Sequence, residues 1–279
     1  MLKFYIKDRN FADFELFTFK KLKLIQMIIL IIKYIKYKIK KILKKFYMFF
    51  LLIKAEKGKN LQLEFPIRIG GNGKLSFGNN CKITKNVYFA CGTGSQIMFG
   101  NNCRIDEKVE IIAGKNAKIV FGDNCWIMKN TIIRTGNKYS FGNNVNIATN
   151  CAIFSREGGH EGELKVGNGT NIGDYTIIDV ADNLIIENDI AIGPNCVIYT
   201  HDHNYTNPKK AAWKGGVVKY PVTIKKEAWV GSNVTILPKT LIDEHCVIAA
   251  GAIVTKNTDK NSIYGGIPAK KIKEINYKE

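Results

Sequence analysis

The first 57 residues of the chain contain no glycine, and the first proline is Pro66. All 25 glycines lie beyond residue 57, so a stretch rich in Lys, Ile and Leu gives way to a glycine-rich one. Glycine and proline are the strongest local breakers of regular structure, so this shift marks a change of architecture. We predict a basic helical segment over residues 1–57, a turn-rich domain over 58–260 and a C-terminal tail over 261–279.

Metal-binding cysteine motifs are also missing. The seven cysteines form no CxxC pair and show no spacing typical of zinc ligands. No cleavable signal peptide is visible, because the first apolar segment starts late and no A-x-A site follows it. We therefore expect a cytoplasmic protein with reduced thiols and no bound metal.

Acidic residues are scarce in the N-terminal segment. Residues 1–60 hold 16 Lys and Arg against 4 Asp and Glu, a net charge of +12, whereas the remaining 219 residues carry only +6. A basic segment attached to a nearly balanced body argues against a nucleic-acid-binding protein. It favours contact between this segment and an anionic surface.

No apolar run in this segment is long enough to span a membrane. The longest run of low charge, residues 24–32, has nine residues, whereas a span needs about 20. Apolar residues instead recur every three or four positions, with lysines on the opposite side, as an amphipathic helix requires. We expect residues 20–54 to lie on an anionic membrane surface, at the inner face of the membrane. The alternative is a helix that packs on protein.

Beyond the boundary the sequence repeats with a period of six. A helix cannot have this period, whereas three short strands per turn, separated by tight bends at Gly or Asn, explain it. We predict an all-β fold of about eight triangular coils, preceded by an incomplete coil at Leu63 and Ile69. The predicted inward positions are all Ile, Val or Phe: Phe77, Ile83, Phe89; Phe99, Ile105, Ile111; Phe121, Ile127, Ile133; Phe141, Ile147, Ile153; Val166, Ile172, Ile178; Ile186, Ile192, Ile198; Ile224, Val230, Ile236; Ile242, Ile248, Val254.

Insertions fall at one place in the repeat. The step within each set of three is always six residues, whereas the step between sets varies from 6 to 26. Every insertion therefore follows a third strand and lies at one corner of the prism. The longest occupies residues 199–222, and loops collected on one edge are where a repeat protein places its site.

The cysteines fit the same repeat. Six of them stand four residues after one of the predicted inward residues, where small side chains fill the core. The alternative is a set of disulfides among the first three in an oxidising compartment. The six are Cys81, Cys103, Cys125, Cys151, Cys196 and Cys246.

The C-terminal part resembles a known family. The runs EAWVGSNVTILPKTLIDEHCVIAAGAIVTKN (227–257) and GGIPAKKI (265–272) are similar to the hexapeptide-repeat acyltransferases. The resemblance covers residues 63–275 and points to the branch of galactoside, maltose and xenobiotic acetyltransferases and polysaccharide O-acetyltransferases. It implies a left-handed parallel β-helix, an exception to the usual crossover rule. It also implies a homotrimer with active sites between subunits and acetyl-CoA as co-substrate.

The same resemblance implies a catalytic histidine. Counting from IGPN at 192–195 places it on His203, with His201 as the rival. A sugar hydroxyl must lose its proton as it attacks, and histidine suits this task because its charge changes near neutral pH. The alternatives are a solvated loop histidine and a metal ligand. The γ-type carbonic anhydrases of this fold need three histidines, and His160 and His245 are the only others here.

Donor and acceptor residues also follow from the resemblance. At the acceptor site Gly173 stands where the galactoside and maltose enzymes carry Asn, and Asp174 and Asp179 are candidates to replace it. The expected acetyl-CoA contacts, of which the last two lysines would face the phosphates, are Trp229, Gly231, Ser232, Ala250, Thr255, Lys256, Lys270 and Lys271.

The expected function is therefore an O-acetyltransferase that moves an acetyl group from acetyl-CoA to a sugar hydroxyl of a cell-surface glycan or its precursor. Three alternatives stay open: transfer to a small free acceptor such as a xenobiotic or free sugar, a non-catalytic trimeric scaffold, and a γ-type carbonic anhydrase.

Overall fold

The computed structural model of the chain describes residues 9–53 and 55–276, which belong to two units, Met1–Phe50 and Leu51–Glu279. The described residues of the first unit belong to a helix, α1 (Arg9–Ile53), which is 45 residues long and ends three residues inside the second unit. All of its side chains whose exposure is defined are exposed, and they include apolar residues from Leu24 to Ile53. Within the described part of the chain, no helix combines the length and the apolar character that a membrane crossing requires.

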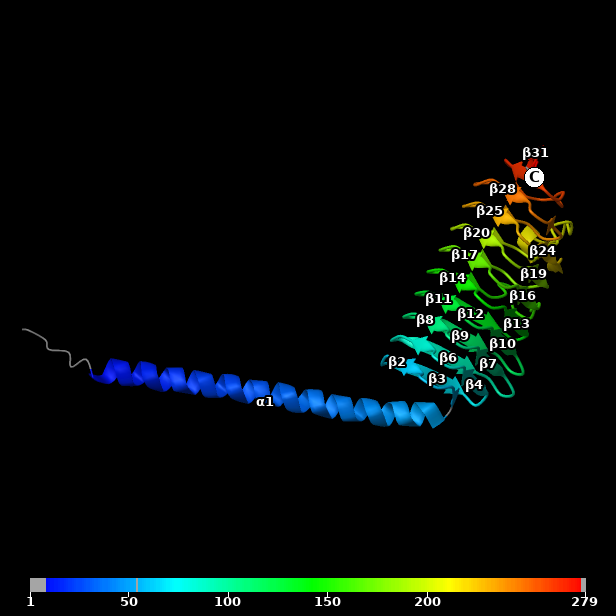
Figure 1. The fold of residues 1–279 in the computed structure, drawn as a ribbon. Coiled ribbons are helices and arrows are strands. Elements are labelled where there is room, and N and C mark those ends of the chain that lie inside the picture. The colour runs from blue at the N-terminus through cyan, green and yellow to red at the C-terminus, as the bar shows by residue number, and fades with distance from the viewer. Residues whose placement is uncertain (1–8, 54, 277–279) are drawn as a thin grey trace, which may run out of the picture. The chain divides into compact units, whose positions relative to one another are not determined.

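The second unit is a parallel β-solenoid with three faces (Figure 1). Each coil contributes one short strand to each of three sheets, so the predicted triangular parallel β-helix is confirmed. The first sheet contains nine parallel strands: β1 (Ala55–Lys57), β4 (Lys74–Phe77), β7 (Gln96–Phe99), β10 (Lys118–Phe121), β13 (Lys138–Phe141), β16 (Leu164–Val166), β19 (Leu184–Ile186), β24 (Val222–Ile224) and β27 (Leu241–Ile242).

The other two sheets follow the same order. The second contains β2 (Gln62–Leu63), β5 (Lys82–Ile83), β8 (Arg104–Ile105), β11 (Trp126–Ile127), β14 (Asn146–Ile147), β17 (Asn171–Ile172), β20 (Ala191–Ile192), β25 (Trp229–Val230), β28 (Val247–Ile248), β30 (Ser262–Gly265) and β31 (Lys270–Glu274). The third contains β3 (Ile67–Gly71), β6 (Val87–Cys91), β9 (Glu110–Ala113), β12 (Ile132–Thr135), β15 (Ala152–Ile153), β18 (Ile177–Ile178), β21 (Val197–Ile198), β26 (Thr235–Ile236) and β29 (Ile253–Val254).

The described residues form nine coils rather than about eight. The predicted incomplete first coil is complete, because β1 pairs in parallel with β4 and places Lys57 opposite Phe77. The sequence hides this strand, since a lysine stands where the later coils have an aromatic or aliphatic residue. At the other end, the predicted C-terminal tail contains two strands. β30 extends the second sheet, and β31 pairs antiparallel with β30.

The core is a column of stacked identical positions. All 24 predicted inward residues are buried. Along one edge the rings of Phe77, Phe99, Phe121 and Phe141 stack almost parallel, with centroids 5.2, 4.8 and 4.5 Å apart. Each coil thus covers the apolar face of the next, which no single coil is able to bury alone.

Asparagine and glycine have different tasks at the bends. Asn80, Asn102 and Asn124 take the left-handed conformation, with φ of 56° to 58°. Their side-chain amides also donate to one another from coil to coil, at 3.1–3.2 Å. Gly78 is needed for close packing instead, because a Cβ there would lie 2.5 Å from the carbonyl carbon of Gly100.

The cysteines are buried free thiols. Five of the six at the repeated position donate to a glycine carbonyl of the next coil, at 3.1–3.2 Å. Thr131 and Thr176 occupy equivalent positions and donate through their hydroxyls to the next coil. The position therefore holds a small side chain, and a Cys or Thr there donates to a carbonyl of the next coil. Cys91 lies elsewhere, at the end of β6, where burial raises the pKa of its thiol to about 11.

Candidate functional site

The insertions gather at the corner where the chain passes from the third sheet to the first, which we call the loop corner. The two longest connect β15 to β16 and β21 to β24. The second is not an open loop, because β22 (His201–His203) pairs antiparallel with β23 (Val217–Lys219) and the short 3₁₀ helix η1 (Ala212–Lys214) lies between them. The predicted single edge of loops is therefore present, and a two-stranded ribbon closes its longest member.

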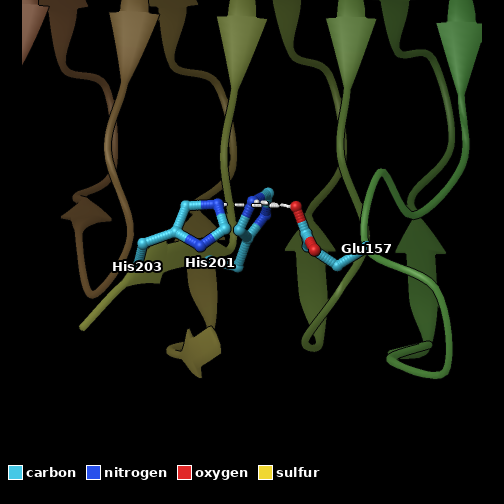
Figure 2. A group of neighbouring side chains, drawn as sticks. All are labelled: Glu157, His201 and His203. Atoms are coloured by element: carbon cyan, nitrogen blue, oxygen red, sulfur yellow. Dashed lines mark ion pairs between the residues drawn. The ribbon is translucent and has the colours of Figure 1, made fainter. Parts of the chain in front are cut away.

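Three side chains converge at the loop corner (Figure 2). Because side chains alternate along a strand, His201 and His203 lie on the same side of β22, with exposed Asp202 between them. The loop after β15 brings the Glu157 carboxylate to them. Glu157 Oε1 lies 3.4 Å from His201 Nε2 and 3.6 Å from His203 Nε2.

A fully buried carboxylate holds the first histidine. Asp179, directly after β18, places Oδ2 2.7 Å from His201 Nδ1. The same carboxylate accepts hydrogen bonds from the backbone N–H groups of Arg156 and Thr200 and from the Thr200 hydroxyl, at 2.7–3.3 Å. A carboxylate with these donors is acceptor-only, so His201 donates its Nδ1–H and keeps a lone pair on Nε2.

The second histidine is more accessible. The His203 side chain is 32% exposed, against 9% for His201. Its Nδ1 is enclosed and has no hydrogen-bond partner among the described residues, which leaves Nε2 as the atom that faces the site. Of the two imidazoles, His203 is therefore the one that an external molecule is able to reach.

The three coils that build the site are consecutive. β15, β18 and β21 are neighbours in the third sheet, and each is followed directly by one part of the site. Glu157 was missed from the sequence because it was treated as part of a polar loop. A usable signal was present, since two insertions at one corner of nearby coils must lie close together. His160 and His245 lie apart from this group, and His245 Nε2 pairs with Glu227 Oε2 at 2.6 Å.

The expected donor residues lie in three places. Trp229, Gly231, Ser232 and Ala250 lie at the end of second-sheet strands, where Gly251 N donates to Ser232 O at 2.9 Å. Trp229 is 58% exposed there. Gly231 is needed for the close approach of the next coil, because a Cβ would lie 2.7 Å from Ala250 N.

The other donor candidates lie elsewhere. Thr255 and Lys256 follow β29 at the loop corner, two coils beyond β21. Lys270 and Lys271 begin β31 and are exposed. The Nζ of Lys271 lies 2.9 Å from Glu274 Oε1 and 3.2 Å from Asp259 Oδ2, and its hydrogen bond to Glu274 raises its pKa. Lys271 therefore already has anionic partners within the chain.

The two acceptor candidates are separated. Asp174 is exposed at the corner between the second and third sheets, where its Oδ1 accepts from Thr149 N at 2.8 Å. Asp179 is buried against His201 instead. At Gly173, where the resemblance implies an asparagine, the backbone leaves no room for a side chain. A Cβ there would lie 2.5 Å from the carbonyl carbon of Gly193 in the next coil.

Comparison with known proteins finds relatives that are similar to part of this chain. No protein-family profile matches the chain. The galactoside O-acetyltransferase of Escherichia coli K12 is 30% identical over 139 residues, which is 50% of this chain and 58% of that protein. The mitochondrial γ carbonic anhydrase 2 of Arabidopsis thaliana is 28% identical over 123 residues, 43% of this chain and 40% of that protein.

Among solved structures, a hexapeptide-repeat acetyltransferase of Vibrio cholerae in complex with acetyl-CoA is 25% identical, with a TM-score of 0.39. The match covers 44% of this chain and 66% of that one. The chain thus spans about two fifths to two thirds of these relatives. The chain is therefore similar, over part of its length, to a galactoside O-acetyltransferase, and its described residues form a parallel solenoid of short repeated coils.

A stability prediction follows from the buried contacts of Thr200. Its hydroxyl donates to Asp179 and accepts from Asp182 N at 3.0 Å. Thr200→Val keeps the shape and removes these bonds, so we expect the free energy of unfolding to fall by about 1–3 kcal/mol in chemical denaturation. Thr84→Val is the matched control, because the buried Thr84 hydroxyl has no hydrogen-bond partner among the residues that the structure describes, and it should be neutral or slightly stabilising. Equal losses in both variants would contradict this account.

Proposed function

We propose that the chain is an acetyl-CoA-dependent O-acetyltransferase that acts on a sugar hydroxyl of a cell-surface glycan or its precursor. The observation that carries this proposal is His203, an accessible imidazole whose Nε2 faces the loop corner of a hexapeptide-repeat solenoid. The similarity to a galactoside O-acetyltransferase supports the class of reaction. The proposal assigns His203 as general base and His201 as its rigid neighbour.

The proposed chemistry needs one proton relay. The sugar hydroxyl gives its proton to His203 Nε2 as its oxygen attacks the thioester carbonyl of acetyl-CoA. The C–S bond then breaks, and the imidazolium returns the proton to the departing sulfur, so that ester and free CoA leave. Backbone N–H groups are the proposed stabilisers of the tetrahedral oxyanion.

Transfer is proposed to be direct. A nucleophilic cysteine would need a reachable thiolate. All seven cysteines are buried, and burial raises the pKa of Cys91 and of Cys151 to about 11, which keeps these two thiols protonated at neutral pH. This arrangement supports a base-assisted transfer rather than an acyl-enzyme.

The donor site is proposed to need a second subunit. Thr255 and Lys256 share the loop corner with His203, two coils away, or about 10 Å along the axis. Trp229 and Ser232 lie at a different corner of the same chain. A single acetyl-CoA would contact both groups if a neighbouring copy in a homotrimer supplied one of them, and the exposed Trp213 and Trp229 are the apolar side chains that such an interface would cover.

The N-terminal helix is the feature that supports a glycan as the acceptor. The lysine-rich, amphipathic α1 would hold the enzyme at an anionic membrane surface, where lipid-linked sugars are assembled. Transfer to a small free acceptor is the second candidate. It is favoured by the position of Asp174, which lies at another corner than His203 and so does not stand beside the proposed base as a contact for a glycan acceptor.

The two histidines provide the test of the mechanism. His203→Ala should lower kcat by about 10²–10⁴, the usual contribution of a general base, with little change in KM for acetyl-CoA. His201→Ala should be milder, because its Nδ1 is engaged with Asp179 and its role is to hold the site. The measurement is steady-state kinetics of both variants at saturating acceptor. An inactive His201→Ala beside a nearly normal His203→Ala would reverse the assignment, and two fully active variants would refute the mechanism.

The helix provides a second test. Deletion of residues 1–54, which ends immediately before β1, should preserve acetylation of a soluble acceptor and abolish co-sedimentation with anionic vesicles. The reason is that two thirds of the net charge lies within residues 1–60, and the deletion removes most of it. A full-length variant with Lys33, Lys36 and Lys40 changed to Gln is the matched control and should bind vesicles more weakly. Equal vesicle binding by truncated and full-length proteins would contradict the membrane role.

A further inference from the structure

Electron-rich atoms of three side chains lie close together at the loop corner: a carboxylate oxygen of Glu157 and the Nε2 atoms of His201 and His203. His201 gives its Nδ1–H to Asp179, so its Nε2 presents a lone pair to Glu157 Oε1 at 3.4 Å. A carboxylate oxygen is also an acceptor, and two acceptors repel one another unless a cation or proton lies between them. The His203 Nε2 meets the same oxygen at 3.6 Å.

No cationic side chain neutralises this group in the described part of the chain. The ion pairs of Glu157 and Asp179 there involve only the two histidines. The nearby guanidinium of Arg156 lies over the ring of Phe154, 4.4 Å from its centroid. Two carboxylates, one of them fully buried, thus face two imidazoles without a fixed positive charge, and such a group favours a bound cation.

We propose that Glu157, His201 and His203 bind one divalent transition-metal ion of the Zn²⁺ type. Zinc bonds of about 2.0–2.2 Å in a tetrahedral site place ligand atoms about 3.4 Å apart. The two distances from Glu157 Oε1, 3.4 and 3.6 Å, match this edge, and all three ligand atoms lie within 4.8 Å of one another. Three ligands leave a fourth position open toward the accessible side of His203.

The contact between Asp179 and His201 supports the same assignment. A metal-bound histidine usually donates its other ring N–H to a carboxylate, which fixes the ring and its tautomer. Asp179 does this at 2.7 Å and is itself held by Arg156 N and Thr200. The sequence analysis predicts no bound metal and keeps a metal ligand only as an alternative role of the histidines, because it counts histidines alone as candidates for the third ligand. Glu157 supplies that ligand from a loop two coils away.

A metal at this site has a consequence for the transferase, and this step rests on the proposed function. The lone pair of His203 Nε2 cannot bind a metal and accept a proton from the acceptor at the same time. Bound Zn²⁺ should therefore inhibit acetyl transfer, and a chelator should restore the activity. The cluster would make the enzyme sensitive to the free zinc concentration.

Zinc binding by the full-length chain tests the site without any activity assay. After chelation and dialysis against micromolar Zn²⁺, elemental analysis should find about one zinc per chain. Glu157→Gln and His201→Ala should each lose that zinc, with circular dichroism confirming that both variants keep the solenoid. His160→Ala is the matched control from the same loop and should keep the full stoichiometry. Asp179→Asn should weaken zinc binding by about 10–100-fold.

Substoichiometric zinc in the native chain, or equal retention by Glu157→Gln and native protein, would overturn the metal site. Zinc binding at one per chain together with unchanged acetylation would overturn the inhibitory role alone. If the chelated protein acetylates no acceptor, the proposed function fails, and the zinc stoichiometry still decides the metal site.

Discussion

The stacking of coils in register is the constraint on which the rest of the molecule depends. Backbone N–H groups of one coil donate to carbonyls of the next, as Gly173 does to Ile192 and Gly193 to Val230, both at 2.8 Å. This ladder requires each inward position to lie directly over its equivalent. An extra residue cannot be accommodated within a strand without breaking the ladder, so insertions emerge only where a strand has ended.

The in-register stacking of coils also brings together the side chains at the loop corner. Glu157, Asp179 and His201 come from three consecutive coils, and each follows a third-sheet strand. Register holds the ends of those strands side by side at about 4.8 Å intervals, so polar residues that are 22 positions apart in sequence become neighbours. The buried Asp179 then fixes His201, while His203, two residues further along β22, keeps an accessible Nε2. One histidine is thus held rigidly, and the other is accessible.

Much of this was predictable, because the period of six encodes the coil directly. The inward positions, the single edge of loops and the two histidines on the longest loop follow from counting residues. The first coil was hidden because an exposed Lys57 pairs in register with the inward Phe77 of the next coil, where the repeat predicts an apolar residue. Glu157 and the burial of Asp179 depend on contacts between loops of different coils, which carry no period. The roles of Asn and Gly at the bends required backbone angles, since Asn80 takes the left-handed conformation and Gly78 serves close packing.

The central claim is that acyl transfer takes place at the loop corner beside His203. The most direct measurement is a crystal structure of the full chain with bound CoA. The account predicts the CoA sulfur within about 4 Å of His203 Nε2, near enough for the proton to pass between them. A sulfur atom bound at another corner of the solenoid, with no path to His203, would contradict it.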